Sequence, residues 1–106
     1  MPVVAWFIFV LAAVLEVGGD ALIRRGLRSG GLVLIAIGFG ILGCYGITVN
    51  MVRWDFSKLL GVYVGVFALV SVLFGRFVFK ENIATFTWLG LLLIIAGGLV
   101  IQFGNR

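Results

Sequence analysis

The stretch VVAWFIFVLAAVLEVGGDALI, residues 3–23, decides the fold of this chain. It is an apolar run interrupted by only two ionisable residues, Glu16 and Asp20. A bilayer core of about 30 Å is crossed by about 20 residues of α-helix at about 1.5 Å per residue, so this stretch predicts a transmembrane helix. Three more stretches have the same length and apolar character: 32–52, 59–79 and 84–103.

The composition supports an integral membrane protein. Of the 106 residues, 63% are hydrophobic and only 11% are charged, whereas a soluble globule needs a polar surface. The connections expected at 24–31, 53–58 and 80–83 are too short to hold a soluble domain. Residues 3–23 lack a preceding basic stretch and carry acids, so we expect them to be retained rather than cleaved as a signal peptide. The sequence therefore predicts an all-α membrane protein, with residues 1–106 forming a single four-helix transmembrane domain.

Several functional classes are disfavoured by the residue content. The chain has one cysteine, Cys44, and no histidine, which argues against disulfide frameworks and zinc sites. It contains no Gly-rich phosphate loop and no nucleophile elbow. The net charge of +4 comes from Arg and Lys at helix ends, where they anchor the segments among anionic headgroups, and the short loops cannot build a nucleic-acid-binding face. We expect no enzymatic activity, no metal, no cofactor and no nucleic-acid partner.

The two sides of the membrane receive nearly equal numbers of basic residues. The side of the first and third connections holds five and the other side three: Arg24, Arg25, Arg28, Arg76 and Lys80 against Arg53, Lys58 and Arg106. Cytoplasmic loops are normally richer in Lys and Arg, so this small difference specifies the orientation only weakly. One explanation of this near balance is chance, because a small protein has few basic residues. The sharper alternative is dual topology, in which copies insert both ways up and pair as an antiparallel homodimer with inverted symmetry.

Glu16 is the main candidate for function. An ionised carboxylate at such a depth is costly, so membrane segments that carry one commonly use it for transport or proton transfer. Helical spacing places Glu16 on one stripe with three small residues, Ala5, Ala12 and Gly19, which leave room around the acid. Protons and a cation would compete for the same carboxylate oxygens. We therefore predict a shared proton and substrate site at Glu16.

Asp20 follows Glu16 by one helical turn and is a second candidate for the same site. The alternative is a structural salt bridge, because Arg24 lies one turn further on and reaches Asp20 more readily than it reaches Glu16.

The third apolar stretch contributes a candidate aromatic and a candidate bend. Gly61 and Gly65 bracket Tyr63. Glycine weakens a helix, so the two glycines mark a bend that we interpret as a gating kink. Tyr63 offers a ring face to a cation or a hydroxyl to Glu16, although packing is the commoner role of an aromatic residue in a bundle.

Glycines also mark faces where helices approach closely. Gly90 and Gly97 stand seven residues apart in a stretch without ionisable residues, and we predict that they form the dimer contact. In the second stretch a ridge of small residues predicts close backbone approach: Ala36, Gly40, Gly43 and Gly46.

Motifs along the full chain resemble the small multidrug resistance transporters of the drug/metabolite transporter superfamily. They are Ala5-Trp6, Glu16-Val17, Gly65, Phe79-Lys80-Glu81 and the octet from Gly90 to Gly97. The sequence also resembles the sister YnfA-like group of small inner-membrane proteins, through Glu16-Val17-Gly18-Gly19 and Tyr63-Val64-Gly65-Val66-Phe67.

The resemblance implies an antiparallel homodimer, or a pair of homologues, in a bacterial or archaeal inner membrane. It implies proton-coupled efflux of small cations of guanidinium, quaternary ammonium or polyamine type, with Glu16 of both subunits as the shared site. Tyr63 stands at the place of the aromatic that flanks the binding chamber. Gly65 matches the kink in the third helix, and Gly90 and Gly97 match the dimer contact.

Two positions depart from that pattern. Leu60 stands where the multidrug branch has a tyrosine, which weakens the expectation of bulky aromatic substrates. Asp20 stands where the family has an uncharged residue, which favours a substrate with more than one positive charge.

Three other functions remain open. A lipid-linked sugar flippase subunit uses the same fold but has less reason to keep an acid among apolar residues. A small dual-topology anion channel, such as a fluoride channel, has a broken third helix rich in Ser, Thr and Phe, whereas 59–79 has only Ser71 as a hydroxyl of that type. A passive assembly subunit predicts that Glu16→Gln changes nothing.

Overall fold

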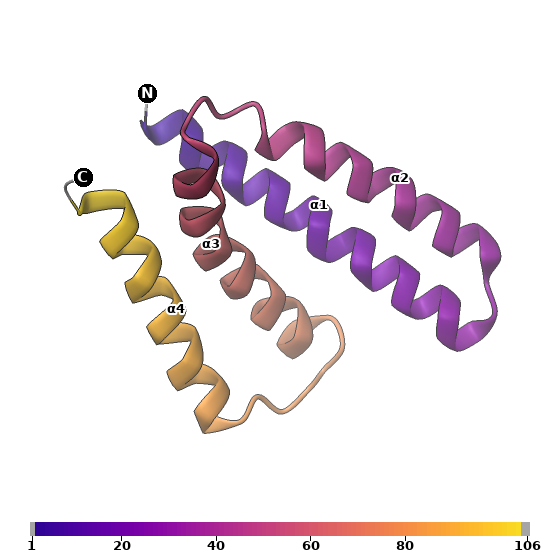
Figure 1. The fold of residues 1–106 in the computed structure, drawn as a ribbon. Coiled ribbons are helices and arrows are strands. Elements are labelled where there is room, and N and C mark those ends of the chain that lie inside the picture. The colour runs from indigo at the N-terminus through magenta and orange to yellow at the C-terminus, as the bar shows by residue number, and fades with distance from the viewer. Residues whose placement is uncertain (1, 105–106) are drawn as a thin grey trace. The chain divides into compact units, whose positions relative to one another are not determined.

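The structure is a computed structural model that describes residues 2–104, and within that range it consists of helices and connections without a strand (Figure 1). The four α-helices are α1 (Pro2–Ser29), α2 (Leu32–Val49), α3 (Phe56–Phe77) and α4 (Thr85–Phe103). All four are long and apolar enough to cross a membrane. The prediction of an all-α protein with four transmembrane helices is confirmed.

The chain divides into two compact units, Met1–Val52 and Arg53–Arg106. Each unit is a helical hairpin, with α1 packed along α2 in the first and α3 packed along α4 in the second (Figure 1). Short connections between consecutive helices produce this antiparallel pairing.

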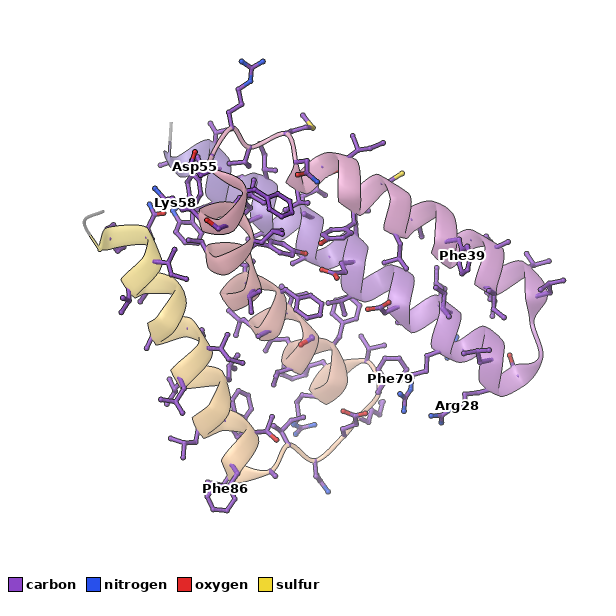
Figure 2. All side chains as sticks on the ribbon, viewed as in Figure 1. Arg28, Phe39, Asp55, Lys58, Phe79 and Phe86 are labelled. Atoms are coloured by element: carbon purple, nitrogen blue, oxygen red, sulfur yellow. The ribbon has the colours of Figure 1, made fainter. Side chains whose placement is uncertain are left out.

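Large apolar side chains are exposed on every helix. Phe39 on α2 and Phe86 on α4 are 67% and 83% exposed and extend away from their helices (Figure 2). Such contiguous apolar surface is typical of a protein that lipid or another membrane segment covers. The chain is thus a multi-pass membrane protein.

The first helix is longer than the sequence indicated. We expected it to end at residue 23, but α1 continues to Ser29, and only Gly30 and Gly31 connect it to α2. Gly30 has a φ of +73°, and the Gly31 N–H donates to the Gly26 carbonyl oxygen at 2.8 Å, which is a Schellman ending. The arginines that we placed in a connection therefore lie on the last turns of α1. The helix therefore ends at a glycine in the left-handed region and not at the first arginines.

The second connection begins and ends earlier than expected. α2 stops at Val49, where the Asn50 side-chain amide donates to the Gly46 carbonyl oxygen at 2.8 Å and caps the last turn. α3 starts at Phe56 rather than at residue 59, because the Leu59 N–H already donates to the Asp55 carbonyl oxygen at 2.8 Å.

The third connection folds back on the end of α3. α3 ends at Phe77, and the following residues up to Ala84 are not helical. The Glu81 N–H donates to the Gly75 carbonyl oxygen at 2.9 Å, and Lys80 takes a left-handed φ of 57°. A Cβ at Gly75 would lie 2.6 Å from the Glu81 Oε1, so the Glu81 side chain lies against the end of α3 at this glycine.

The residues of the charge comparison lie at or near helix ends, except Arg106, which is outside the described residues. Lys58 lies in the first turn of α3 with its Nζ 4.7 Å from the centre of the Trp54 ring, a cation–π contact. The weak orientation preference and the dual topology remain predictions.

Candidate functional site

Glu16 lies in the middle of α1 and is half-buried. The small residues predicted to share its stripe, Ala5, Ala12 and Gly19, are all buried. Glu16 is therefore set among small side chains along a packed face of α1.

Glycine contacts define how α1 faces α2. A Cβ at Gly19 would lie 2.9 Å from Leu42 Cγ and 3.1 Å from the Gly38 carbonyl oxygen. A Cβ at Gly38 would in turn lie 2.6 Å from Ile23 Cγ1, so the two helices approach closely at this level. Further toward the turn, a Cβ at Gly26 would lie 2.7 Å from Ile35 Cγ1.

These contacts form a regular ladder. Position 26 faces 35, 23 faces 38, and 19 faces 42, so each step back along α1 matches an equal step forward along α2. The ladder of facing residues is called the α1–α2 seam below. Three residues further from the connection, about 4.5 Å along each helix axis, the same spacing pairs Glu16 with Tyr45.

Tyr45 is a site residue that the sequence reasoning missed. It is half-buried like Glu16, and the spacing of the seam places the two residues opposite each other. Glu16 lies 14 residues before Gly30, and Tyr45 lies 14 residues after Gly31. Counting outward from a two-residue turn would have paired them, but the expected connection at 24–31 concealed this symmetry.

Asp20 is exposed, in contrast to Glu16 one turn earlier. Of the two acids on α1, Glu16 is the one on the seam. A role for Asp20 as the second acid of the site stays a prediction.

Tyr63 and its flanking glycines lie in the second hairpin. Tyr63 is buried, with its ring centroid 6.3 Å from that of Phe67. Its pairing with Glu16 stays a prediction.

α3 is helical throughout Gly61 and Gly65. A Cβ at Gly61 would lie 2.7 Å from Ile101 Cδ1, and one at Gly65 would lie 3.7 Å from Ile95 Cα, so both glycines allow α4 to pack closely. Their function as a gating kink stays a prediction.

The two glycines predicted to form the dimer contact do not pack against α3. No atom lies within 4 Å of a Cβ built at Gly90 or Gly97. α4 meets α3 through Gly98 instead, whose Cβ would lie 3.6 Å from the Val62 carbonyl oxygen. Gly90 and Gly97 thus present an open surface, and their contact with a second copy stays a prediction.

The glycine ridge predicted on α2 is likewise not used within the hairpin. A Cβ at Gly40, Gly43 or Gly46 would have open space around it. Gly38, which the sequence reasoning did not single out, is the glycine of α2 that approaches α1. Hydrophobic patterning could not distinguish them, because all of them lie in one apolar run.

Residues 2–104 contain no cluster of three or more His, Cys, Asp and Glu that could hold a metal ion. Cys44 is exposed on α2 next to Tyr45.

Comparison with known proteins identifies the family. The family described as "Uncharacterised BCR, YnfA/UPF0060 family" matches residues 3–106. The chain is 34% identical over 102 residues to the UPF0060 membrane protein SAB2216c of Staphylococcus aureus strain bovine RF122 / ET3-1, with 94% of each chain covered. The UPF0060 membrane proteins SaurJH9_2364 of strain JH9 and SA2130 of strain N315 show the same identity and coverage. No solved structure matches the chain. Of the two resemblances seen in the sequence, the YnfA-like one is confirmed, and this chain belongs to the YnfA/UPF0060 family of membrane proteins.

Proposed function

We propose that this protein is a proton-coupled efflux transporter that exchanges small cations for protons at Glu16. The observation that carries the proposal is the position of this acid: half-buried, in the middle of a helix long enough to cross a membrane, and opposite Tyr45 on the seam. Ionisable residues at such depth are expensive and are usually found where ions or protons pass.

Competition for one carboxylate explains the exchange. The ionised Glu16 binds a cation, and a proton that neutralises Glu16 releases it. If only the loaded or the protonated site changes sides, protons moving inward drive cations outward. No cofactor is needed for this cycle.

Alternating access requires two arrangements of nearly equal energy. An antiparallel dimer supplies them, because its two halves are the same chain in inverted orientation. The near balance of basic residues on the two sides of the membrane supports this assembly. In such a dimer the two Glu16 carboxylates form one site, in the inner membrane of a bacterium or archaeon.

The substrate class follows from the charge of the site. A carboxylate pair surrounded by apolar surface favours compact organic cations, and we propose guanidinium, quaternary ammonium and polyamine compounds. Tyr63 would add an aromatic face for the cation.

The test is cation-driven proton flux in liposomes that contain the purified protein and a pH-sensitive dye. Guanidinium, tetramethylammonium and putrescine serve as probe cations. We expect proton flux with at least one probe in the parent protein and none with Glu16→Gln, because the amide can neither release a proton nor neutralise a cation.

Glu81→Gln is the matched control. It makes the same chemical change at an exposed position in the connection between α3 and α4, so flux should persist. Equal flux in the parent and in Glu16→Gln would contradict the proposal and favour a passive role for this chain.

A further inference from the structure

The α1–α2 seam contains one polar pair. By the spacing of the seam, the facing pairs on either side of Glu16 and Tyr45 are Ala12 with Val49 and Gly19 with Leu42. None of these four residues has a side chain that can donate a hydrogen bond. Ala12 and Val49 are also among the most buried residues of the chain, at 0% and 1% exposure. On the seam, Tyr45 is therefore the side-chain donor at the level of the carboxylate.

The chemistry of the carboxylate makes the donor important. A carboxylate removed from water loses free energy unless hydrogen-bond donors replace the water. A guanidinium ion brings its own planar N–H donors and can satisfy both oxygens. A quaternary ammonium ion brings charge but no donor, so the protein has to supply one.

We propose that Tyr45 is the residue that sets cation specificity at this site, by donating its hydroxyl hydrogen to the Glu16 carboxylate when the bound cation has no N–H group. This inference rests on the proposed function. It predicts that removing the Tyr45 hydroxyl weakens the binding of quaternary ammonium ions more than the binding of guanidinium ions.

The test is Tyr45→Phe, which keeps the ring and removes the hydroxyl. In the liposome assay, the KM for tetramethylammonium should rise about tenfold, as expected for the loss of one hydrogen bond to a charged group. The KM for guanidinium should change less than about threefold, because this cation supplies its own donors. The kcat for both cations should stay close to that of the parent.

Ser29→Ala is the matched control. It removes a hydroxyl from an exposed position at the end of α1, far from Glu16 and Tyr45, so neither KM should change. Equal changes in both KM values with Tyr45→Phe, or no change in either, would overturn the inference. If the parent transports none of the three probe cations, the proposed function is wrong as well, and the spectroscopic test below decides the hydrogen bond independently of transport.

The spectroscopic test uses the low number of glutamates. The chain has two, Glu16 and Glu81, so in a Glu81→Gln background carbon-13 glutamate labels Glu16 alone. We expect the antisymmetric carboxylate stretch of the tetramethylammonium-loaded protein to move to higher wavenumber with Tyr45→Phe. An unshifted band would overturn the inference.

A second substitution covers the case in which Tyr45→Phe fails to assemble. The chain has two tyrosines, so 3-fluorotyrosine incorporated in a Tyr63→Phe background modifies Tyr45 alone and preserves its shape. The more acidic hydroxyl should lower the wavenumber of the Glu16 band, and an unchanged band would count against the hydrogen bond.

Discussion

At the scale of single residues, the two acids of α1 have different surroundings although they are one turn apart. Glu16 is half-buried on the seam, opposite Tyr45, whereas Asp20 is exposed. A difference in burial of this kind separates the roles of neighbouring carboxylates, because the less hydrated one pays more to stay charged without a partner. This difference supports the proposal that the exchange chemistry belongs to Glu16, with an auxiliary electrostatic role for Asp20.

Asp20→Asn tests that assignment. Removing the second acid should raise the KM for putrescine by about threefold to fivefold, since an exposed charge pair contributes up to about 1 kcal/mol. The KM for guanidinium, which carries a single charge, should stay within about twofold by the same estimate. Both values come from the liposome assay, and a larger loss for guanidinium than for putrescine would place Asp20 at the exchange site itself.

At the scale of helices, close approach through glycine positions the site. α1 and α2 meet where Gly19 and Gly38 allow backbone to approach backbone, one turn from Glu16. Small residues at helix crossings are the common means of association in membranes, where van der Waals packing takes the place of the hydrophobic effect. The register between the two helices, and hence the facing of Glu16 and Tyr45, depends on this crossing.

Gly38→Ala should weaken the first hairpin. Its new Cβ would lie 2.7 Å from the Gly19 carbonyl oxygen and 2.6 Å from Ile23 Cγ1, so the helices have to separate. The expected loss in the free energy of unfolding is about 1–3 kcal/mol, typical of overpacking. Unfolding in detergent, followed by circular dichroism, measures it.

Gly43→Ala is the companion variant on the same helix, because the added methyl group would have open space around it. It should be neutral or slightly stabilising, since alanine is the better helix former. Equal destabilisation by both variants would contradict the conclusion that the close approach of α1 and α2 depends on Gly38.

At the scale of the whole molecule, the chain is two hairpins with extensive exposed apolar surface. On α4 the glycines at 90 and 97 are open, whereas Gly98 is used against α3. Within one chain, Gly98 is thus the glycine of α4 that packs against α3. Gly90 and Gly97 form a separate open face on which another membrane segment could pack. This supports the proposed dimer, with Gly90 and Gly97 at its contact.

Gly97→Leu should weaken self-association without unfolding the hairpin. Donor- and acceptor-labelled copies mixed in liposomes should show at least about a tenfold loss of dimer affinity, because the added side chain separates helices that rely on close contact. Gly40→Leu fills an equally open position on α2 and should leave the dimer intact. Energy transfer at the parent level in Gly97→Leu would rule out this face as the contact.

Local composition is enough to derive much of this protein. The apolar runs determined the four helices, because the thickness of a bilayer sets the required length regardless of the partner. The depth of Glu16 in the first run marked it as the candidate functional acid, because an ionised carboxylate is costly at that depth. Gly90 and Gly97 could be identified as a small-residue face from their spacing alone.

Tertiary structure decided what depends on register. Spacing could not tell that Gly38, rather than Gly40 or Gly43, meets α1, or that Tyr45 faces Glu16. These facts follow from the length of the connection, and the Schellman ending at Gly30 reduced it to two residues while the arginines had suggested a longer loop. Hydropathy is a property of each segment, whereas the facing of two helices depends on the geometry of the turn between them and on where their backbones can touch.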